Sequence, residues 1–293
     1  MERAGLKTIS LDDLPKYSPW TKRVLGLESF VYGARSEHNA RREYDAEKFK
    51  KLLEYKQGNP DCSIKVIHDI YFGLHQKKYQ SSYISLGGEL FLTSPKNAYK
   101  ILDDVLVKKL SAILSQSNCN TLMDLGCGYG YNLNLAARHY TQYKYIGGDF
   151  SENALALGRI FAKDSIFFAY FNFYNKSWKI FDRLKKGDRA LVFTCYAIEQ
   201  LPSAKIFFQM IKKYKDKISD VVHFEPVYEL FDDSTLLGLM RRRYIKLNDY
   251  NCDLLSILKE NGEFLKIVDL KADLIGVNAL HPVCFVHWRF KDF

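Results

Sequence analysis

The sequence TLMDLGCGYG, residues 121–130, decides the fold of this chain. Five mostly apolar residues, typical of a buried strand, lead into glycines at positions 126, 128 and 130. Glycine lets the backbone turn sharply and approach a ligand with no side chain between. The helix predicted from about Tyr131 to Tyr140 points its N-terminal amides and the positive end of its dipole at this turn. The stretch therefore predicts a strand, a ligand-binding loop and a helix, an arrangement that suits the carboxylate and ribose region of a nucleoside ligand.

The spacing of the glycines distinguishes between classes of ligand. A dinucleotide-binding loop reads G-x-G-x-x-G, which would place its third glycine at position 131, where this chain has Tyr131. No Gly-Lys-Ser/Thr follows, so a phosphate-binding P-loop is excluded. Asp149 stands at the end of the next predicted strand, where a carboxylate can accept hydrogen bonds from both hydroxyls of a ribose. The alternative is an ordinary tight turn, in which Asp149 only flanks a helix.

Predicted strands and helices alternate along the rest of residues 118–293. Strands are expected at 121–125, 144–148, 166–171, 190–195, 220–224, 264–270 and 283–290, and helices at 131–140, 152–162, 203–214 and 232–260. This alternation predicts an α/β fold with a doubly wound, mostly parallel seven-stranded sheet and helices on both faces. A loop without helical pattern joins the last two strands, so we expect them to form an antiparallel C-terminal hairpin.

Residues 1–117 differ in character and predict a mainly helical N-terminal extension. A charged helix is expected at 41–57, and a second helix runs from the Ser94-Pro95 cap to about Leu114. Between them lies YQSSYISLGGELFL, residues 79–92, which is expected to be a loop rich in tyrosine, serine and glycine.

Bulk composition narrows the function classes. The chain has 293 residues, of which 47% are hydrophobic and 15% aromatic, and aromatic residues at this level suggest a pocket lined with rings. No apolar run is long enough for a membrane span, and MERAGLKTISLDDL lacks the apolar core of a secretory signal. Six cysteines without a CxxC pair argue against a disulfide framework or a metal site. We therefore expect a cytoplasmic protein without a metal, and we attribute the net charge of +9 mainly to solvated helix faces.

The motif D-L-G-C-G-Y-G at 124–130, followed by G-G-D-F-S at 147–151, resembles the first two signature motifs of class I S-adenosylmethionine-dependent methyltransferases. The resemblance covers roughly residues 118–293 and implies S-adenosylmethionine as cofactor. It implies that the methionine part is surrounded by Asp124, Gly126, Cys127, Gly128 and Gly130. It further implies that Asp149 holds the ribose and that Phe150 belongs to the cofactor site.

The same resemblance assigns the ends of the third and fourth strands. Asn172 would hydrogen-bond the adenine edge while Phe171 or Phe173 stacks on it, although an acid is common in the family where this chain has Asn172. Thr194 and Tyr196 belong to the segment that lies beneath the transferring methyl group in the family.

Four side chains are candidates for catalysis. His223 and Glu225 alternate with Phe224 at the end of the fifth strand, so both project to one side near the sheet edge where ligands bind. His223 is our first choice for a general base, with Glu225 to orient it, and His281 is the second choice. Glu199 is a candidate for orienting the substrate or its base. The alternatives are a buried, hydrogen-bonded His223–Glu225 pair and a Glu199 that only favours the start of a helix.

Short segments later in the chain faintly resemble sugar O-methyltransferases of glycan and antibiotic clusters. These are HFEPVYE at 223–229, MRRRYIKL at 240–247 and the region around His281. The resemblance implies a small polar acceptor with a hydroxyl, whose phosphates would pair with Arg241, Arg242 or Arg243. The extension would then close over the acceptor as a lid, with Tyr79 and Tyr83 in its loop. An RNA or protein methyltransferase and a non-catalytic cofactor-binding partner subunit remain as alternatives, and the oligomeric state stays open.

Overall fold

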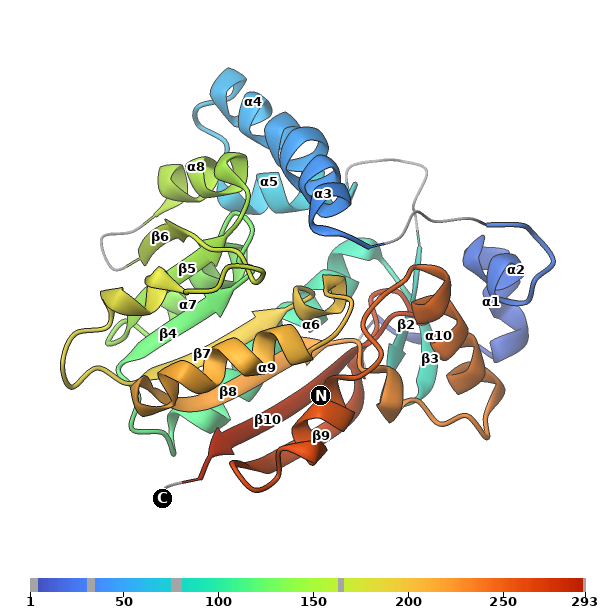
Figure 1. Cartoon of the computed structure of the whole chain (residues 1–293). Helices are drawn as coiled ribbons and strands as arrows, with labels where there is room; N and C mark the ends of the chain where they lie inside the picture. The colour runs from blue at the N-terminus through green and yellow to red at the C-terminus, as the bar shows by residue number, and fades with distance from the viewer. Residues whose placement is uncertain (1–4, 31–34, 75–80, 163–165, 292–293) are drawn as a thin grey trace.

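The computed structural model describes residues 5–30, 35–74, 81–162 and 166–291, and a seven-stranded sheet forms its centre (Figure 1). The strand order is β6-β5-β4-β7-β8-β10-β9. The strands are β4 (Thr121–Leu125), β5 (Lys144–Asp149), β6 (Ile166–Tyr170), β7 (Ala190–Cys195), β8 (Ile218–Glu225), β9 (Leu265–Ile275) and β10 (Val283–Phe290). The seven-stranded sheet predicted from the sequence is confirmed, with β4 and β7 bounded as expected.

The final two strands reverse the direction of the sheet. Strands β4 to β8 pair in parallel, whereas β10 pairs antiparallel with β8 on one side and with β9 on the other. The predicted C-terminal hairpin is therefore confirmed. The hairpin joins the sheet through its second strand, so that β9 becomes the outer edge.

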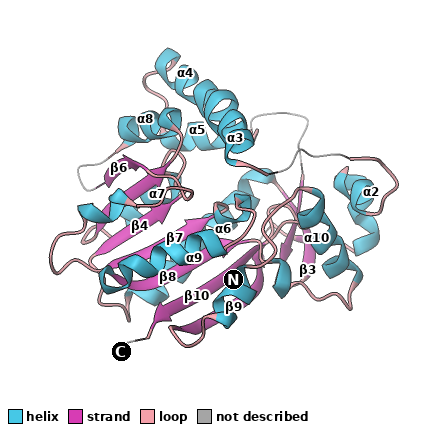
Figure 2. Ribbon diagram, viewed as in Figure 1, coloured by secondary structure: helices cyan, strands magenta, loops and turns pink. Residues whose placement is uncertain are grey.

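Helices cover both faces of the sheet (Figure 2). On one face, the core consists of strand side chains packed against α6 (Pro95–Leu114), α7 (Tyr131–His139) and α8 (Glu152–Phe161). On the other face, the core includes residues of α9 (Lys205–Ile211) and α11 (Leu254–Glu260). Successive strand residues alternate between the two cores, as Leu122 and Met123 do in β4. Their burial on both faces is why these strands read as near-continuous apolar runs in the sequence.

The helical region predicted at 232–260 contains two helices instead of one. Helix α10 (Leu236–Leu247) begins at Thr235, whose side chain accepts a hydrogen bond from the amide of Gly238. The helix ends before Asp249, which has a φ of 53°, and α11 follows after Asp253. Within the described residues, none of the helices combines the length and the apolar composition that a membrane crossing requires.

The N-terminal part packs along the sheet as helices and a small second sheet. Its helices are α1 (Leu14–Tyr17), α2 (Trp20–Val24), α3 (Glu37–Ala40), a π-helical stretch η2 (Arg41–Phe49), α4 (Lys50–Gly58) and α5 (Ile64–Tyr71). The segment predicted as a loop at 79–92 is instead a hairpin, β2 (Ser82–Leu86) and β3 (Glu89–Thr93), joined to β1 (Lys7–Thr8) in the order β1-β3-β2. Both residues of the Gly87-Gly88 turn have positive φ, which favours such a hairpin.

Candidate functional site

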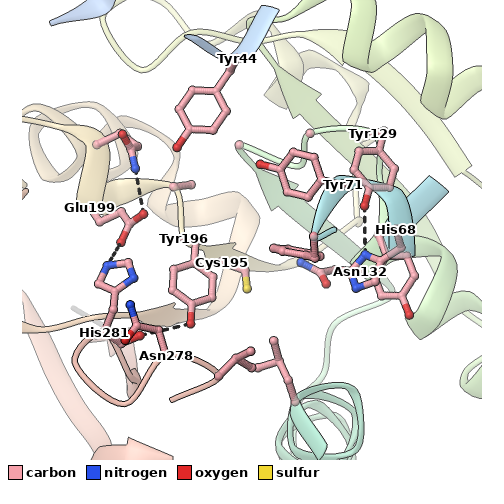
Figure 3. A pocket seen from close by; sticks show the side chains of 18 of the residues that line it. Tyr44, His68, Tyr71, Tyr129, Asn132, Cys195, Tyr196, Glu199, Asn278 and His281 are labelled. Carbon is pink, nitrogen blue, oxygen red and sulfur yellow. Dashed lines mark hydrogen bonds and ion pairs between the residues drawn. The ribbon is translucent and has the colours of Figure 1, made fainter. Parts of the chain in front are cut away.

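A cavity of about 670 Å³ lies at the carboxyl ends of the central strands, within the usual size range of ligand pockets. Its walls come from the glycine loop, from the ends of β5, β6 and β7, and from the N-terminal part of the chain. Figure 3 shows Glu199, His281 and Tyr196 on one side, His68 and Tyr129 on the other, and Cys195 between them. Tyrosine and other aromatic side chains line much of it, as the composition suggested.

The glycine loop 126–130 is held close to the neighbouring strand and helix. The amides of Gly126 and Cys127 donate to the carbonyl oxygen of Gly148 at 2.7 and 3.0 Å. All three glycines have positive φ, and a Cβ on Gly126 would lie 2.5 Å from the Cβ of Ala197. Gly126, Cys127 and Gly128, three of the residues predicted to bind the cofactor, line the cavity.

Gly130 is not among the residues that line the cavity. It stands at the N-cap of α7 with a φ of 74°, and a Cβ there would collide with the ring of Phe168. We attribute its role to close packing between α7 and β6.

The Asp149 carboxylate lies at the end of β5, buried and in contact with the cavity. It accepts hydrogen bonds from the amides of Gly128 and Ser151, each at 2.8 Å. Burial raises the pKa of Asp149 to about 6, although these two amides oppose the rise. Asp149 thus fixes the glycine loop and presents an acceptor to the cavity.

Asp124 lies beneath the site and is not among the cavity-lining residues. Its side chain is 1% exposed, and neither carboxylate oxygen has a hydrogen-bond partner among the described residues. Burial, followed by the charges of Asp149 and Glu225, raises the pKa of Asp124 well above its usual value. The structure thus does not bring Asp124 to the ligand space that the resemblance implied.

Phe150, Asn172 and Phe173, also predicted to bind the cofactor, line the cavity where β5 and β6 end. Residues of α3 and η2 form the adjoining wall, which no sequence pattern predicted. Glu37 accepts a hydrogen bond from the amide nitrogen of Asn172 at 2.6 Å, and Phe49 lies against Gly128.

Two further contacts hold this N-terminal wall in place. Asp45 accepts hydrogen bonds from the Ser151 hydroxyl at 2.5 Å and from the Asn153 amide at 3.2 Å, at the start of α8. The buried Arg35 donates to Gln200 Oε1 at 2.7 Å and to the carbonyl oxygen of Asn248 at 3.1 Å. These contacts span more than a hundred residues of sequence, so no local pattern signals them.

Glu199 and His281 meet on the far side of the cavity, next to Tyr196 (Figure 3). Glu199 Oε2 lies 2.8 Å from His281 Nε2, without the alignment of a good hydrogen bond, and the contact becomes an ion pair when the imidazole is protonated. The side chains of both residues are at least 88% buried. The structure therefore brings together two of the four predicted catalytic side chains.

Tyr196 and Tyr83, the two tyrosines predicted to bind substrate, also line the cavity. Tyr196 has a φ of 53°, an uncommon conformation for a residue with a side chain. The Tyr83 hydroxyl is 2.7 Å from Ser18 Oγ and 3.1 Å from Asn278 Oδ1. Tyr79, predicted to belong to the same lid, lies outside the described residues.

Glu225 is not among the cavity-lining residues, but it supports the segment that does line it. Its carboxyl group accepts hydrogen bonds from the amides of Ala197 at 2.9 Å, Ile198 at 3.1 Å and Glu199 at 3.3 Å. Burial and then the charge of Glu199 raise the pKa of Glu225 to about 8. Glu225 therefore positions the Glu199 backbone and does not touch a ligand.

His223, the first choice for a base, is buried in the core instead of lying at the cavity. Trp288 Nε1 donates to His223 Nε2 at 3.0 Å, so the proton of the neutral ring is on Nδ1, which lies 2.9 Å from Thr194 Oγ1. Burial lowers the pKa of His223 to about 3. Thr194 is likewise fully buried and does not line the cavity. The alternative of a buried, hydrogen-bonded His223 describes the structure better, although its partners are Thr194 and Trp288 and not Glu225.

The arginines predicted to bind substrate phosphates are not among the cavity-lining residues. Arg241 is buried, where it pairs with Asp273 at 2.7 Å and donates to the carbonyl oxygen of Ala279 at 2.9 Å. Arg242 pairs with Asp233, and Arg243 is exposed. Arg241 thus ties α10 to the loop that carries His281, and the phosphate interpretation has no structural support.

His68 is a cavity residue that sequence reasoning did not single out. Its Nδ1 lies 2.9 Å from the Tyr129 hydroxyl, and its ring stacks on Tyr131 with centroids 3.5 Å apart. Burial lowers the pKa of His68 to about 3, so the ring is neutral. A lone histidine on an amphipathic helix carries no signal of this kind in the sequence.

No family model and no curated protein matches this chain. Among solved structures, the S-adenosylmethionine-dependent methyltransferase SibL aligns with a TM-score of 0.45 and 15% identity, over 64% of this chain and 54% of SibL. The plantazolicin methyltransferase BpumL, in complex with a triazolic desmethylPZN analog and SAH, aligns with a TM-score of 0.44 and 13% identity, over 84% and 99% of the two chains. The methyltransferase domain of bacterial CtHen1-C aligns with a TM-score of 0.46 and 16% identity, over 66% of this chain and 100% of that domain. These TM-scores are below 0.5, so what the cavity binds has to be inferred from its own residues.

Proposed function

We propose that this chain is an S-adenosylmethionine-dependent methyltransferase that acts on a hydroxyl group of a small polar molecule. The observation that carries the proposal is one continuous cavity. It has the glycine loop and Asp149 at one end and the Glu199–His281 pair at the other. A donor bound over the loop therefore lies in the same cavity as an acceptor bound beside His281.

The residues at the first end fit a nucleoside bearing an amino acid. The Asp149 carboxylate suits ribose hydroxyls, and the rings of Phe150 and Phe173 provide flat apolar surface for a base. Gly126 and Gly128 keep the loop bare of side chains where the ligand would pass, and a Cβ on Gly128 would lie 3.2 Å from the ring of Phe49. When bound, S-adenosylmethionine supplies an activated methyl group.

The Glu199–His281 pair can handle the proton that a hydroxyl acceptor must lose. Because Nε2 of His281 faces the Glu199 carboxylate, Nδ1 is the nitrogen that accepts the proton from the acceptor hydroxyl. Glu199 orients the ring and stabilises the imidazolium that forms. Tyr196 and Tyr83 line the space beside this pair, where the acceptor would lie.

We propose an acceptor without phosphate, such as a sugar or a hydroxylated natural product. Arg241 and Arg243, on which a phosphorylated acceptor depended, do not line the cavity. The volume of the cavity, about 670 Å³, is also typical of a site for a small molecule.

Turnover of the donor with a panel of hydroxylated sugars and natural products tests the proposal. Release of S-adenosylhomocysteine above the acceptor-free rate is expected with at least one member, and its absence favours the non-catalytic alternative. With a working acceptor, His281→Ala should lower kcat about 10²-fold or more, and Glu199→Gln should lower it less. The matched control is His139→Ala, because His139 is exposed and remote from the cavity. Near wild-type turnover in His281→Ala would reject this histidine as the base.

A further inference from the structure

The contact between Glu37 and Asn172 places a hydrogen-bond donor beside an acceptor in the cavity wall. Asn172 Oδ1 accepts from the amide of Tyr174 at 2.9 Å, which fixes the orientation of the side-chain amide. Its Nδ2 then donates one hydrogen to Glu37 Oε1 at 2.6 Å. An amide nitrogen carries two hydrogens, so one remains for a ligand.

Glu37 is held in this position by its own helix. Arg41, one turn further along, donates to the same oxygen Oε1 at 3.2 Å through Nε and 3.1 Å through Nη2. Arg41 also donates to the Tyr170 hydroxyl at 2.6 Å, and its guanidinium lies 5.3 Å from the ring centre of Phe150. The two hydrogen bonds from Arg41 and the one from Asn172 all end on Oε1, and the carboxylate has a second oxygen to offer to a ligand.

The order of the strands places this pair where the base of a bound nucleoside would lie. Along the sheet edge, Asn172 follows β6, Asp149 ends β5, the glycine loop follows β4 and Cys195 ends β7. A ribose on Asp149 with its sulfur directed toward Cys195 therefore has its base on the Asn172 side. Asn172, Glu37 and Asp149 all line the one cavity.

We propose that Glu37 and Asn172 together read the adenine edge of the cofactor, with Glu37 as the residue that sets its specificity. This inference rests on the proposed function. Adenine presents an acceptor at N1 next to a donor at its 6-amino group, and the pair offers the complementary donor and acceptor. Hypoxanthine has the opposite pattern, with a donor at N1 and an acceptor at O6. A hypoxanthine base would place its N1 donor against the Asn172 donor and its O6 acceptor against the Glu37 acceptor.

The test compares the dissociation constants of S-adenosylhomocysteine and S-inosylhomocysteine by calorimetry. Wild-type protein should prefer the adenosyl compound by about 10- to 100-fold, because a site built to hydrogen-bond one pattern rejects its reverse. In Glu37→Gln, the amide can rotate to donate to O6, which removes one of the two mismatches, so the ratio should fall at least about threefold. Glu47→Gln is the matched control, since Glu47 is exposed on the same helical run and does not line the cavity.

The outcomes separate the two proposals. A wild-type protein that binds neither compound overturns the proposed function. A wild-type protein that binds the adenosyl compound without preference over the inosyl compound overturns the reading of adenine by this pair. The same conclusion follows if Glu37→Gln keeps the wild-type ratio, with thermal melting used to show that the variant is folded. A collapse of the ratio in Glu37→Gln but not in Glu47→Gln supports Glu37 as the specificity residue.

Discussion

Replacing Asp149 by Asn should weaken the binding of S-adenosylhomocysteine more than any other change of similar size in the cavity. The Asp149 carboxylate accepts two amide hydrogen bonds at 2.8 Å while facing the ligand space. An asparagine keeps one acceptor oxygen and sets its NH₂ group against either an amide or a ribose hydroxyl. Loss of one hydrogen bond to a charged group costs about 1.5–3 kcal/mol, which corresponds to about a 10- to 150-fold higher Kd.

The pH dependence of binding provides a second reading of the same residue. Burial raises the pKa of Asp149 to about 6, so protonation in the free protein begins to compete with ligand binding near that pH. If the ionised form binds, the affinity of wild-type protein should fall as the pH decreases through about 6, approaching tenfold per unit below it. Asp149→Asn has no such proton to bind, and its affinity should change little over the same range.

Calorimetric titration between about pH 5 and 7.5 measures both effects, with Asp182→Asn as the exposed control. Unchanged affinity in Asp149→Asn at neutral pH would refute the assignment of this carboxylate to the ribose. If the affinity of Asp149→Asn falls with decreasing pH as much as the affinity of wild-type protein, the titrating group is not Asp149.

His223→Ala should lower the free energy of unfolding by about 2–4 kcal/mol, because it opens a cavity and removes two buried hydrogen bonds. The folded variant should bind the ligand as wild type does, and a loss of calorimetric affinity as large as the loss of stability would contradict this. Gly126→Ala should reduce binding and stability far more than Gly128→Ala. Both glycines have positive φ, but only at Gly126 would the new Cβ lie 2.5 Å from the Cβ of Ala197. Equal losses for the two variants in denaturation and in ligand titration would count against this geometry. Arg241→Met should lower stability in chemical denaturation by about 3–5 kcal/mol, because it removes the cation that pairs with the buried Asp273 carboxylate. The control Arg243→Met, at an exposed position, should change stability by less than about 0.5 kcal/mol. Comparable losses in the two variants would show that the buried ion pair is not the cause.

The strands were predictable because each local pattern agrees with the global sheet. In β4, all five residues are buried between two helical layers, and the apolar run ends at the glycine turn. The Gly87-Gly88 hairpin also had a local signal, since a two-glycine turn between apolar-rich runs is typical of a hairpin. The tyrosine, serine and glycine content of residues 79–92 favoured a loop over this hairpin signal, and the loop prediction was wrong.

The candidate catalytic residues were less predictable, because the periodicity of a strand shows which side chains share a face but not what packs against that face. Alternation places His223 and Glu225 on one side of β8, where Trp288 of β10 and the backbone of residues 197–199 bind them. His281 and Glu199 come from segments 82 residues apart in sequence, and only the folded chain brings them within 2.8 Å. Glu37 was missed for the same reason, since its partner Asn172 is 135 residues away.

The position of β10 between β8 and β9 also determines the order in which the fold can be completed on the ribosome. β9 is synthesised before β10, yet it has no place beside β8 until β10 pairs with both. During translation, the edge of β8 thus stays open while the preceding strands can already assemble. An open strand edge is a template for pairing with other chains, so this stage of synthesis is the one most exposed to edge-to-edge aggregation. The strand that closes this edge also carries Trp288, the partner of buried His223, so completion of the core and removal of the exposed edge occur in a single docking event.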